Sequence, residues 1–153
     1  MSWETHIADA TVEIFSTMLM MDVSSQPPLT ERIKSHQDSV TGMVGMAGVY
    51  KGMLAIHAPS QVAMSITGNF LGLEVDSVND DVKDAMGELA NMLAGSIKAK
   101  LSDNSKDIQL SIPSAVYGDS YSLDYQPQQG SSMVPFESAD GRFLVELQLE
   151  QQT

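Results

Sequence analysis

The apolar residues of this chain follow two different periods, which predict both helices and strands. Apolar residues that return every three or four positions predict amphipathic helices, and alternating or short continuous apolar runs predict strands. The helical period occurs over residues 2–21, 60–71 and 79–102. The strand patterns occur over residues 39–58, which turn near residues 50–52 to make two strands, and over 108–117, 133–138 and 142–150. This order predicts an α+β fold with long helices packed on one face of a mixed or antiparallel sheet.

Local residue types set the expected ends of these elements. Ser60 follows a proline and is expected to cap the N-terminus of the second helix. Pro113 cannot donate to a sheet ladder, so its strand is expected at an edge or a bulge. Asp140-Gly141 predicts a tight hairpin. In the final strand one side is apolar, and the opposite side carries Glu146, Gln148 and Glu150.

Two polar stretches predict loops. Residues 22–38 contain two consecutive prolines and are expected to connect elements, with a short helix near residues 31–36. Residues 118–132 are rich in Ser, Gly and Gln and predict a flexible loop.

Composition and charge narrow the class of protein. The 153 residues suit a single domain, and we expect residues 1–153 to form it. Twenty acidic residues against eight basic ones give a net charge of −12, which disfavours binding to nucleic acid or anionic lipid. The chain has no cysteine, and no apolar run approaches the roughly 18 residues of a membrane helix. The N-terminus has no signal-peptide pattern, so we expect a cytoplasmic protein.

Common catalytic and metal-binding patterns are missing from the sequence. His6, His36 and His57 are expected on three separate elements, as surface or turn residues without metal-ligand spacing. No glycine-rich phosphate loop and no nucleophile-elbow motif occurs. The only arginines are Arg32 and Arg142, so the cations that hold a phosphate substrate would come from a partner.

The segment 79–102 carries the most informative pattern. On a helical wheel one side, expected to face the core, gathers Val82, Met86, Leu89, Leu93 and Ile97. The opposite side gathers Asp84, Glu88, Asn91 and Gly95. Glu88 and Asn91 are three residues apart and are therefore neighbours on the helix surface. Gly87 and Gly95 flank this stripe, and a bare helix surface lets another protein approach closely.

The two halves of the chain show a weak repeat between the first helix and the segment 79–102. Asp9, Ala10 and Glu13 correspond to Asp84, Ala85 and Glu88, and the expected apolar residues Ile7, Ile14 and Met18 correspond to Val82, Leu89 and Leu93. Ser16 stands where the second half has Asn91. The matched helical phase favours pseudo-repeated halves.

The run Asp84-x3-Glu88-x2-Asn91-x22-Pro113 resembles the signature of the CheC/CheX/FliY phosphatases. That signature has Asp or Ser, then Glu, Asn and Pro, and all four positions and three gaps match within residues 84–113. The first helix keeps Glu13 but has Ser16 in place of the Asn, with no proline at the equivalent place downstream. The sequence therefore resembles CheX-like members most, which have one active helix and form dimers.

The resemblance implies a phosphatase that hydrolyses the aspartyl phosphate of a CheY-like response regulator. It implies that Asn91 orients the attacking water and that Glu88 pairs with the receiver lysine, although the residues alone leave Glu88 open as a general base. Asp84, Gly87 and Gly95 are expected to contact the partner, and Pro113 to shape the adjoining strand. Mg²⁺ is expected in the receiver, with no cofactor in this chain, and we expect a homodimer.

Two other functions remain open at this point. One is a non-catalytic adaptor of the same fold that binds a receiver domain or a flagellar-switch protein. The other is a dimeric structural protein whose methionine-rich first helix forms the interface. An adaptor has no need of an amide at position 91, so Asn91 favours the enzyme.

Overall fold

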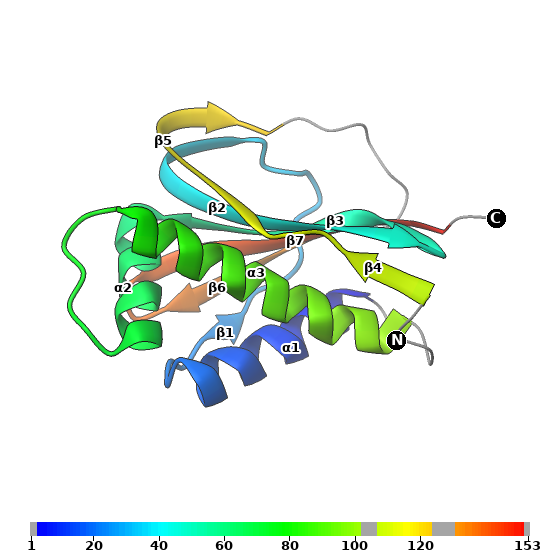
Figure 1. Cartoon of the computed structure of the whole chain (residues 1–153), viewed down its shortest axis with the longest axis horizontal. Coiled ribbons are helices and arrows are strands. Elements are labelled where there is room, and N and C mark those ends of the chain that lie inside the picture. The colour runs from blue at the N-terminus through cyan, green and yellow to red at the C-terminus, as the bar shows by residue number, and fades with distance from the viewer. Residues whose placement is uncertain (1–2, 102–106, 124–130, 152–153) are drawn as a thin grey trace.

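The computed structural model describes residues 3–101, 107–123 and 131–151 of the chain. Within these residues, three helices and seven strands follow one another along the chain (Figure 1). The helices are α1 (Trp3–Met18), α2 (Ser60–Leu71) and α3 (Asp80–Leu101). The strands are β1 (Ser24–Ser25), β2 (Ser35–Gly48), β3 (Tyr50–Pro59), β4 (Ile108–Leu110), β5 (Ser114–Ser122), β6 (Ser132–Ser138) and β7 (Gly141–Gln151).

The strands form one antiparallel sheet in the order β1-β6-β7-β3-β2-β4, with β5 also paired to β2. Its centre is the β3–β7 pair, in which Leu54 lies opposite Leu147. Each half of the chain places a hairpin on one side of this centre and lends an edge strand to the hairpin of the other half. The predicted α+β class is confirmed, and the exchange of edge strands fits the weak repeat in the sequence.

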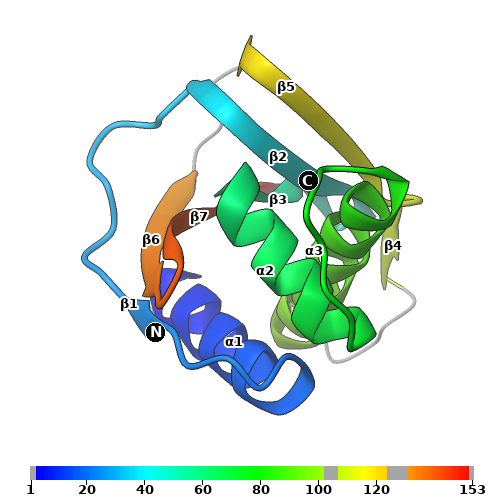
Figure 2. The same ribbon diagram turned by 90° about the vertical axis from the view of Figure 1, so that its left-hand side faces the viewer.

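The helices lie on one face of the sheet, which curves around them (Figure 2). Phe15 of α1 stacks on Phe143 of β7 with ring centroids 4.8 Å apart, in a core between helices and sheet. Helix α3 crosses β2 very closely at Gly42, where a Cβ would stand 2.3 Å from the carbonyl oxygen of Met86. Only glycine allows this approach, and it fixes the position of α3. Among the described helices, none combines the length and apolar character needed to cross a bilayer.

The other face of the sheet is partly covered by its own strands. The start of β2 and the end of β5 pair with each other and bend back over this face (Figure 1). Asp38 of β2 has a φ of 43°, which breaks the strict alternation of side chains along the strand. His36 and Thr41, five positions apart, therefore both contact His57 of β3. We call residues 35–38 and 119–122 the curled ribbon.

The covered face changes the environment of β7. Glu146 and Gln148 lie on the side opposite the aliphatic residues, as the alternation predicts, yet both are buried, with 0% and 4% of their surface exposed. Alternation assigns side chains to two faces, but it does not reveal that a distant pair of strands covers the second face.

Three local predictions are wrong. Residues 31–34 are irregular rather than helical, and β2 begins at Ser35. Ser60 does not cap α2 with its side chain, because its hydroxyl donates to the carbonyl and carboxylate of Asp38 instead. Residues 118–122 continue β5 because they pair with β2. The rest of that expected loop, residues 124–130, lies outside the described residues.

The buried side of α1 also differs from the prediction. Ile7 is buried, but Ile14 is only partly buried and Met18 is 56% exposed. Phe15 and Leu19 enter the core instead. Helical period identifies a side of the helix, but it does not indicate where along the axis the core ends.

Candidate functional site

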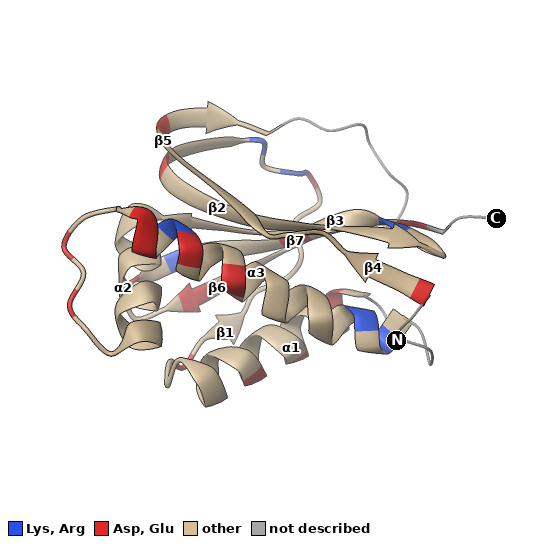
Figure 3. Cartoon of the chain, in the orientation of Figure 1, with Lys and Arg blue, Asp and Glu red and all other residues tan. Residues whose placement is uncertain are grey.

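Helix α3 divides its side chains as the sequence predicts. Five residues are at most 1% exposed and pack into the core: Val82, Met86, Leu89, Leu93 and Ile97. On the other side Asp84 and Glu88 are exposed, and Asn91 and Gly95 are partly exposed. Acidic residues occupy its first turn and lysines its last, which is the order that the helix dipole favours (Figure 3).

Glu88 and Asn91 stand one turn apart on this exposed side. Neither side chain has a hydrogen bond or ion pair with any other residue that the structure describes. A carboxylate accepts hydrogen bonds or pairs with a cation, whereas an amide both accepts and donates. The pair therefore offers an anion and a neutral donor-acceptor group to a molecule that docks on α3.

We call the exposed side of α3 that carries Asp84, Glu88 and Asn91 the ridge. A hollow of about 480 Å³ separates the ridge from the start of β5. Its walls come from the N-terminal half of α3, including Asp84, Gly87 and Glu88, and from the segment that begins at Pro113. Gly87 is buried beside the proline, where a Cβ would lie 3.5 Å from the Cβ of Pro113. The structure thus brings three motif positions and Gly87 to one hollow, and places Asn91 one turn farther along α3.

A second hollow, of about 340 Å³, lies on the other flank of the ridge. Asp84 and Glu88 line it together with Phe70 and Leu71 at the end of α2. The two carboxylates therefore project between two depressions. Beyond Asn91, a Cβ on Gly95 would meet no atom within 4 Å, so the fold itself does not require glycine there.

The corresponding residues of α1 do not form an equivalent pair. Glu13 and Ser16 are exposed, and α1 runs antiparallel to α3 (Figure 1). Glu13 borders a separate hollow of about 350 Å³ against the C-terminal half of α3, with Ser96 and Lys100 on its far wall. Within the described residues, α3 alone presents a Glu and an Asn one turn apart.

A buried polar network, which no pattern in the sequence predicts, lies beneath the curled ribbon. Arg32 donates to both carboxylate oxygens of Glu146, from Nε and Nη2. His57 Nε2 lies 3.0 Å from Glu146 Oε1, and His57 Nδ1 lies 2.8 Å from Thr41 Oγ1. Thr41 Oγ1 is also 2.8 Å from the hydroxyl of Tyr121. The chain of contacts links β5, β2, β3 and β7 to the loop that carries Arg32.

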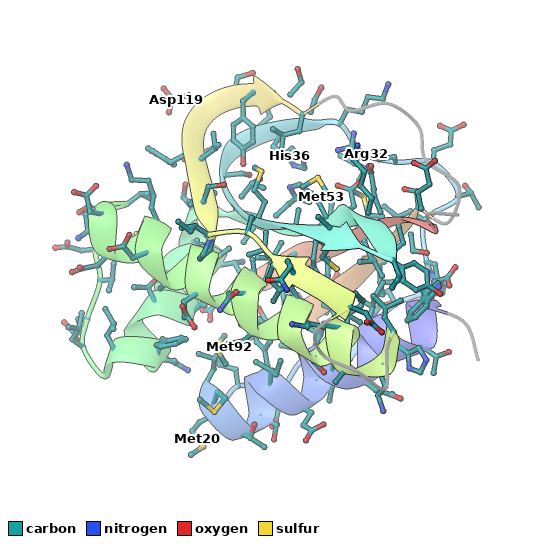
Figure 4. All side chains as sticks on the ribbon, turned by 45° about the vertical axis from the view of Figure 1, so that its right-hand side comes forward. Met20, Arg32, His36, Met53, Met92 and Asp119 are labelled. Carbon is teal, nitrogen blue, oxygen red and sulfur yellow. The ribbon has the colours of Figure 1, made fainter. Side chains whose placement is uncertain are left out.

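His36 of the curled ribbon covers this network, and Figure 4 shows it on the same side of the sheet as Arg32. It stacks on His57 with ring centroids 4.3 Å apart. The prediction of His36 and His57 as separate surface or turn residues is therefore wrong, because the curled ribbon brings them together. The one weak signal in the sequence is a histidine at a buried strand position, and nothing in the sequence indicates its partners.

Burial and the neighbouring groups act in opposite directions on the pKa of Glu146, whereas burial and repulsion from Arg32 both lower the pKa of His36. Burial alone would raise the pKa of Glu146, but hydrogen bonds from His57 and Arg32 outweigh it and lower the pKa below its usual value. Burial lowers the pKa of His36 from 6.5 to about 4, and electrostatic repulsion from His57 and Arg32 adds to this effect, whereas Glu146 opposes it. The Nε2 atom of His36 is buried without a hydrogen-bond partner among the described residues. A neutral His36 therefore covers an ionised, fully paired Glu146.

Acidic residues near the ridge do not converge on a single point. Across the described ranges, no group of three or more His, Asp or Glu side chains is arranged to hold a metal ion.

Comparison with known proteins places this chain in a family. The family described as "Chemotaxis phosphatase CheX" matches residues 40–137. CheY-P phosphatase CheX of Thermotoga maritima is 27% identical over 96 residues, which span 62% of this chain and 61% of that protein. The chemotaxis protein CheX of Desulfovibrio desulfuricans has the same fold, with a TM-score of 0.82, 27% identity, and coverage of 95% of this chain and 97% of that one. The CheX-CheY-BeF3-Mg²⁺ complex of Borrelia burgdorferi matches with a TM-score of 0.81 at 20% identity, covering 96% and 97% of the two chains. Because this family matches residues 40–137, almost two thirds of the length, the chain belongs to the chemotaxis phosphatase CheX family.

Proposed function

We propose that this chain hydrolyses the aspartyl phosphate of a phosphorylated CheY-like receiver domain. The observation that carries the proposal is the unpartnered Glu88–Asn91 pair, in which Glu88 is exposed and Asn91 partly exposed on a helix whose other side is buried in the core. Membership of the CheX family supports the same reaction. A relative of the same fold forms a complex with CheY, which supports the same partner.

Asn91 is assigned to the attacking water. An acyl phosphate already has a good leaving group, so a catalyst mainly needs to hold water in line with the bond that breaks. The carbonyl of an amide can accept from that water while its NH₂ donates to a phosphoryl oxygen. The amide is neutral, so it approaches the phosphoryl group without the repulsion that a carboxylate would meet.

Glu88 is assigned to anchoring the receiver through an ion pair with its active-site lysine. The carboxylate projects between two hollows, which gives an incoming side chain room on either flank. A general base at the same position is the competing role. The two roles separate kinetically, because loss of an anchor raises KM, whereas loss of a base lowers kcat and changes its dependence on pH.

The remaining motif residues support docking. Asp84 adds a second carboxylate one turn before Glu88, and Gly95 leaves the helix bare where a receiver loop would approach. Gly87 and Pro113 pack together and shape the wall of the larger hollow. The Mg²⁺ that neutralises the phosphoryl group belongs to the receiver in this proposal, and the complex of the Borrelia relative with CheY also contains Mg²⁺.

Phosphate release from a purified receiver tests the reaction. The receiver is charged with a small-molecule phosphodonor in Mg²⁺, and its decay is followed with and without the full chain. Asn91→Ala should reduce the acceleration by about 100-fold or more, while binding to the receiver persists. Glu13→Ala is the matched control, because it removes an exposed helical glutamate that lacks the neighbouring amide. Full activity of the Asn91→Ala variant would exclude the water-positioning role.

The second candidate is an adaptor of the same fold that binds a receiver without hydrolysis. Exposure of Glu88 fits both functions, but an adaptor gives no reason for an unpartnered amide beside it. The phosphate-release assay separates the two, because an adaptor binds the receiver and leaves its rate of dephosphorylation unchanged.

We further propose that the chain forms a homodimer through a sheet edge. In the described part of the structure β5 pairs with β2 along one side only, and an open strand edge is a template for pairing with another strand. Light scattering coupled to gel filtration measures the mass in solution. A mass of one chain, 16.5 kDa, at micromolar concentration would exclude a stable dimer.

A further inference from the structure

Four large apolar side chains are exposed around the ends of α1 and α2, and one of them, Leu71, lines a hollow together with Glu88. Met20 is 84% exposed, Met18 56%, Leu73 51% and Leu71 45%. Exposed single apolar residues are common, but a contiguous group of large ones marks a contact surface. We call these four residues the apolar patch.

The backbone conformation and exposure of Met20 indicate that its side chain does not stabilise the fold. Met20 has a φ of 54°, immediately after α1, where the left-handed conformation favours glycine or asparagine. Its neighbour Leu19 is buried, so the turn is fixed and Met20 is directed outward. A large apolar side chain at this position disfavours folding and remains in solvent, which points to a role in binding.

Leu73 is exposed for a related reason. It follows Gly72, which ends α2 in the left-handed conformation, and its amide donates to the carbonyl of Gly68 at 3.1 Å. When a helix ends in this way, the second residue after the helix commonly packs on the side chain five positions before it. Here these two residues are Leu73 and Gly68. Glycine has no side chain to cover it, so Leu73 remains half exposed.

The patch is hollowed and continuous with the candidate site. Met20 and Leu73 line a depression of about 940 Å³ between the end of α1, α2 and the segment after it. Leu71 lines the next hollow together with Glu88. Met92 follows Asn91 on the flank of α3, and Figure 4 shows it on the same side of the molecule as Met20. One surface therefore runs from Glu88 across the end of α2 to Met20.

We propose that the apolar patch is the second contact area for the phosphorylated receiver, which seats an apolar cluster of its own on Met20 and Leu73. This inference rests on the proposed function. A carboxylate and an amide are too small to hold a protein domain, and stable interfaces have an apolar centre with a polar rim. Methionine suits such a centre because its side chain adapts to the partner. The rim here is acidic, with Glu74, Asp76 and Asp81 exposed, so the receiver cluster is expected to have basic neighbours.

The test compares two patch variants with a control elsewhere. Met20→Gly removes the side chain and also suits the left-handed backbone, so it should not lower the melting temperature. Leu73→Ser removes the second contact. Val49→Ser is the matched control, because Val49 is 43% exposed but lies at the β2–β3 turn. Each full-length variant is assayed with a purified CheY receiver, phosphorylated for turnover and beryllofluoride-activated for binding.

The patch variants should raise KM and the receiver Kd about fivefold each, and leave kcat unchanged at saturating receiver. Unchanged KM and Kd would overturn the proposal. If only the oligomeric mass changed, the patch would instead be a contact between copies of this chain, which would also overturn the proposal. A wild-type chain that binds the receiver without dephosphorylating it would refute the proposed function, while the Kd values would still decide the role of the patch. A wild-type chain that neither binds nor dephosphorylates the receiver would overturn both.

Discussion

Acidification should destabilise this protein well above the pH at which carboxylates titrate, and His36 is the cause. Its ring is buried between the curled ribbon and the sheet, in contact with His57 and Tyr121 and near Arg32 and Glu146. Its pKa is lowered from 6.5 to about 4. The unfolded chain therefore takes up a proton near pH 6.5 that the folded chain accepts only near pH 4.

The direction and size of the effect follow from proton linkage. A lowered pKa in the folded state contributes full stability above pH 6.5 and loses it as the pH falls towards 4. At about 1.4 kcal/mol per pH unit, the whole shift corresponds to about 3 kcal/mol, of which about 2 kcal/mol is lost between pH 7 and pH 5. For a domain of this size that loss lowers the melting temperature by roughly 5 °C.

Urea unfolding at pH 7, 6 and 5 measures the effect. His36→Phe keeps an aromatic ring on His57 and Tyr121 but cannot titrate, so its free energy of unfolding should lose about 2 kcal/mol less over this range. His6→Phe removes a histidine outside the network and serves as the control. Equal losses of stability in wild type and His36→Phe, or an NMR titration midpoint of His36 near pH 6.5, would show that His36 is not the cause.

Three further substitutions test the packing that positions the site. Gly42→Ala should destabilise the fold by about 3 kcal/mol or more in urea unfolding, because the new Cβ would stand 2.3 Å from the carbonyl oxygen of Met86. Gly95→Ala should raise the free energy of unfolding by about 1 kcal/mol, since the new Cβ would meet no atom within 4 Å. The same substitution should raise KM for the receiver, and an unchanged KM would show that Gly95 is not part of the contact surface. Glu146→Gln should cost about 3–5 kcal/mol, measured by urea unfolding at pH 7, because Arg32 and His57 lose their buried anion. A loss below 1 kcal/mol would show that the ion pair is dispensable.

The sequence was sufficient to predict α3 and the stripe on its outer side. A helix that packs on a sheet has one apolar side, so the positions of Val82 and Leu93 also fix where Glu88 and Asn91 point. The distant Pro113 was predictable as a motif position, but the hollow that it shares with Glu88 required the fold. Local period gives the orientation of a side chain, whereas a hollow depends on how two distant segments approach each other.

The buried network could not be predicted from the sequence. Its members are spread from Arg32 to Glu146, and each occupies a position that an ordinary surface residue could occupy. Asp38 is the residue that decides the outcome, because its left-handed conformation turns His36 towards His57. Aspartate tolerates that conformation, but most aspartates do not adopt it, so the residue type alone predicts no bend.

Strand β2 connects the candidate site on α3 with the buried network on the other face of the sheet. Gly42 of β2 holds α3 against the sheet, and β2 also pairs with β5, whose first residues form a wall of the hollow beside Glu88. The same strand carries His36 and Thr41 into the network on the opposite face. Loosening the curled ribbon therefore loosens the pairing that positions the wall of the hollow. It follows that substitutions in the network should alter receiver binding at pH values where the protein is still folded, although no residue of the network lines that hollow.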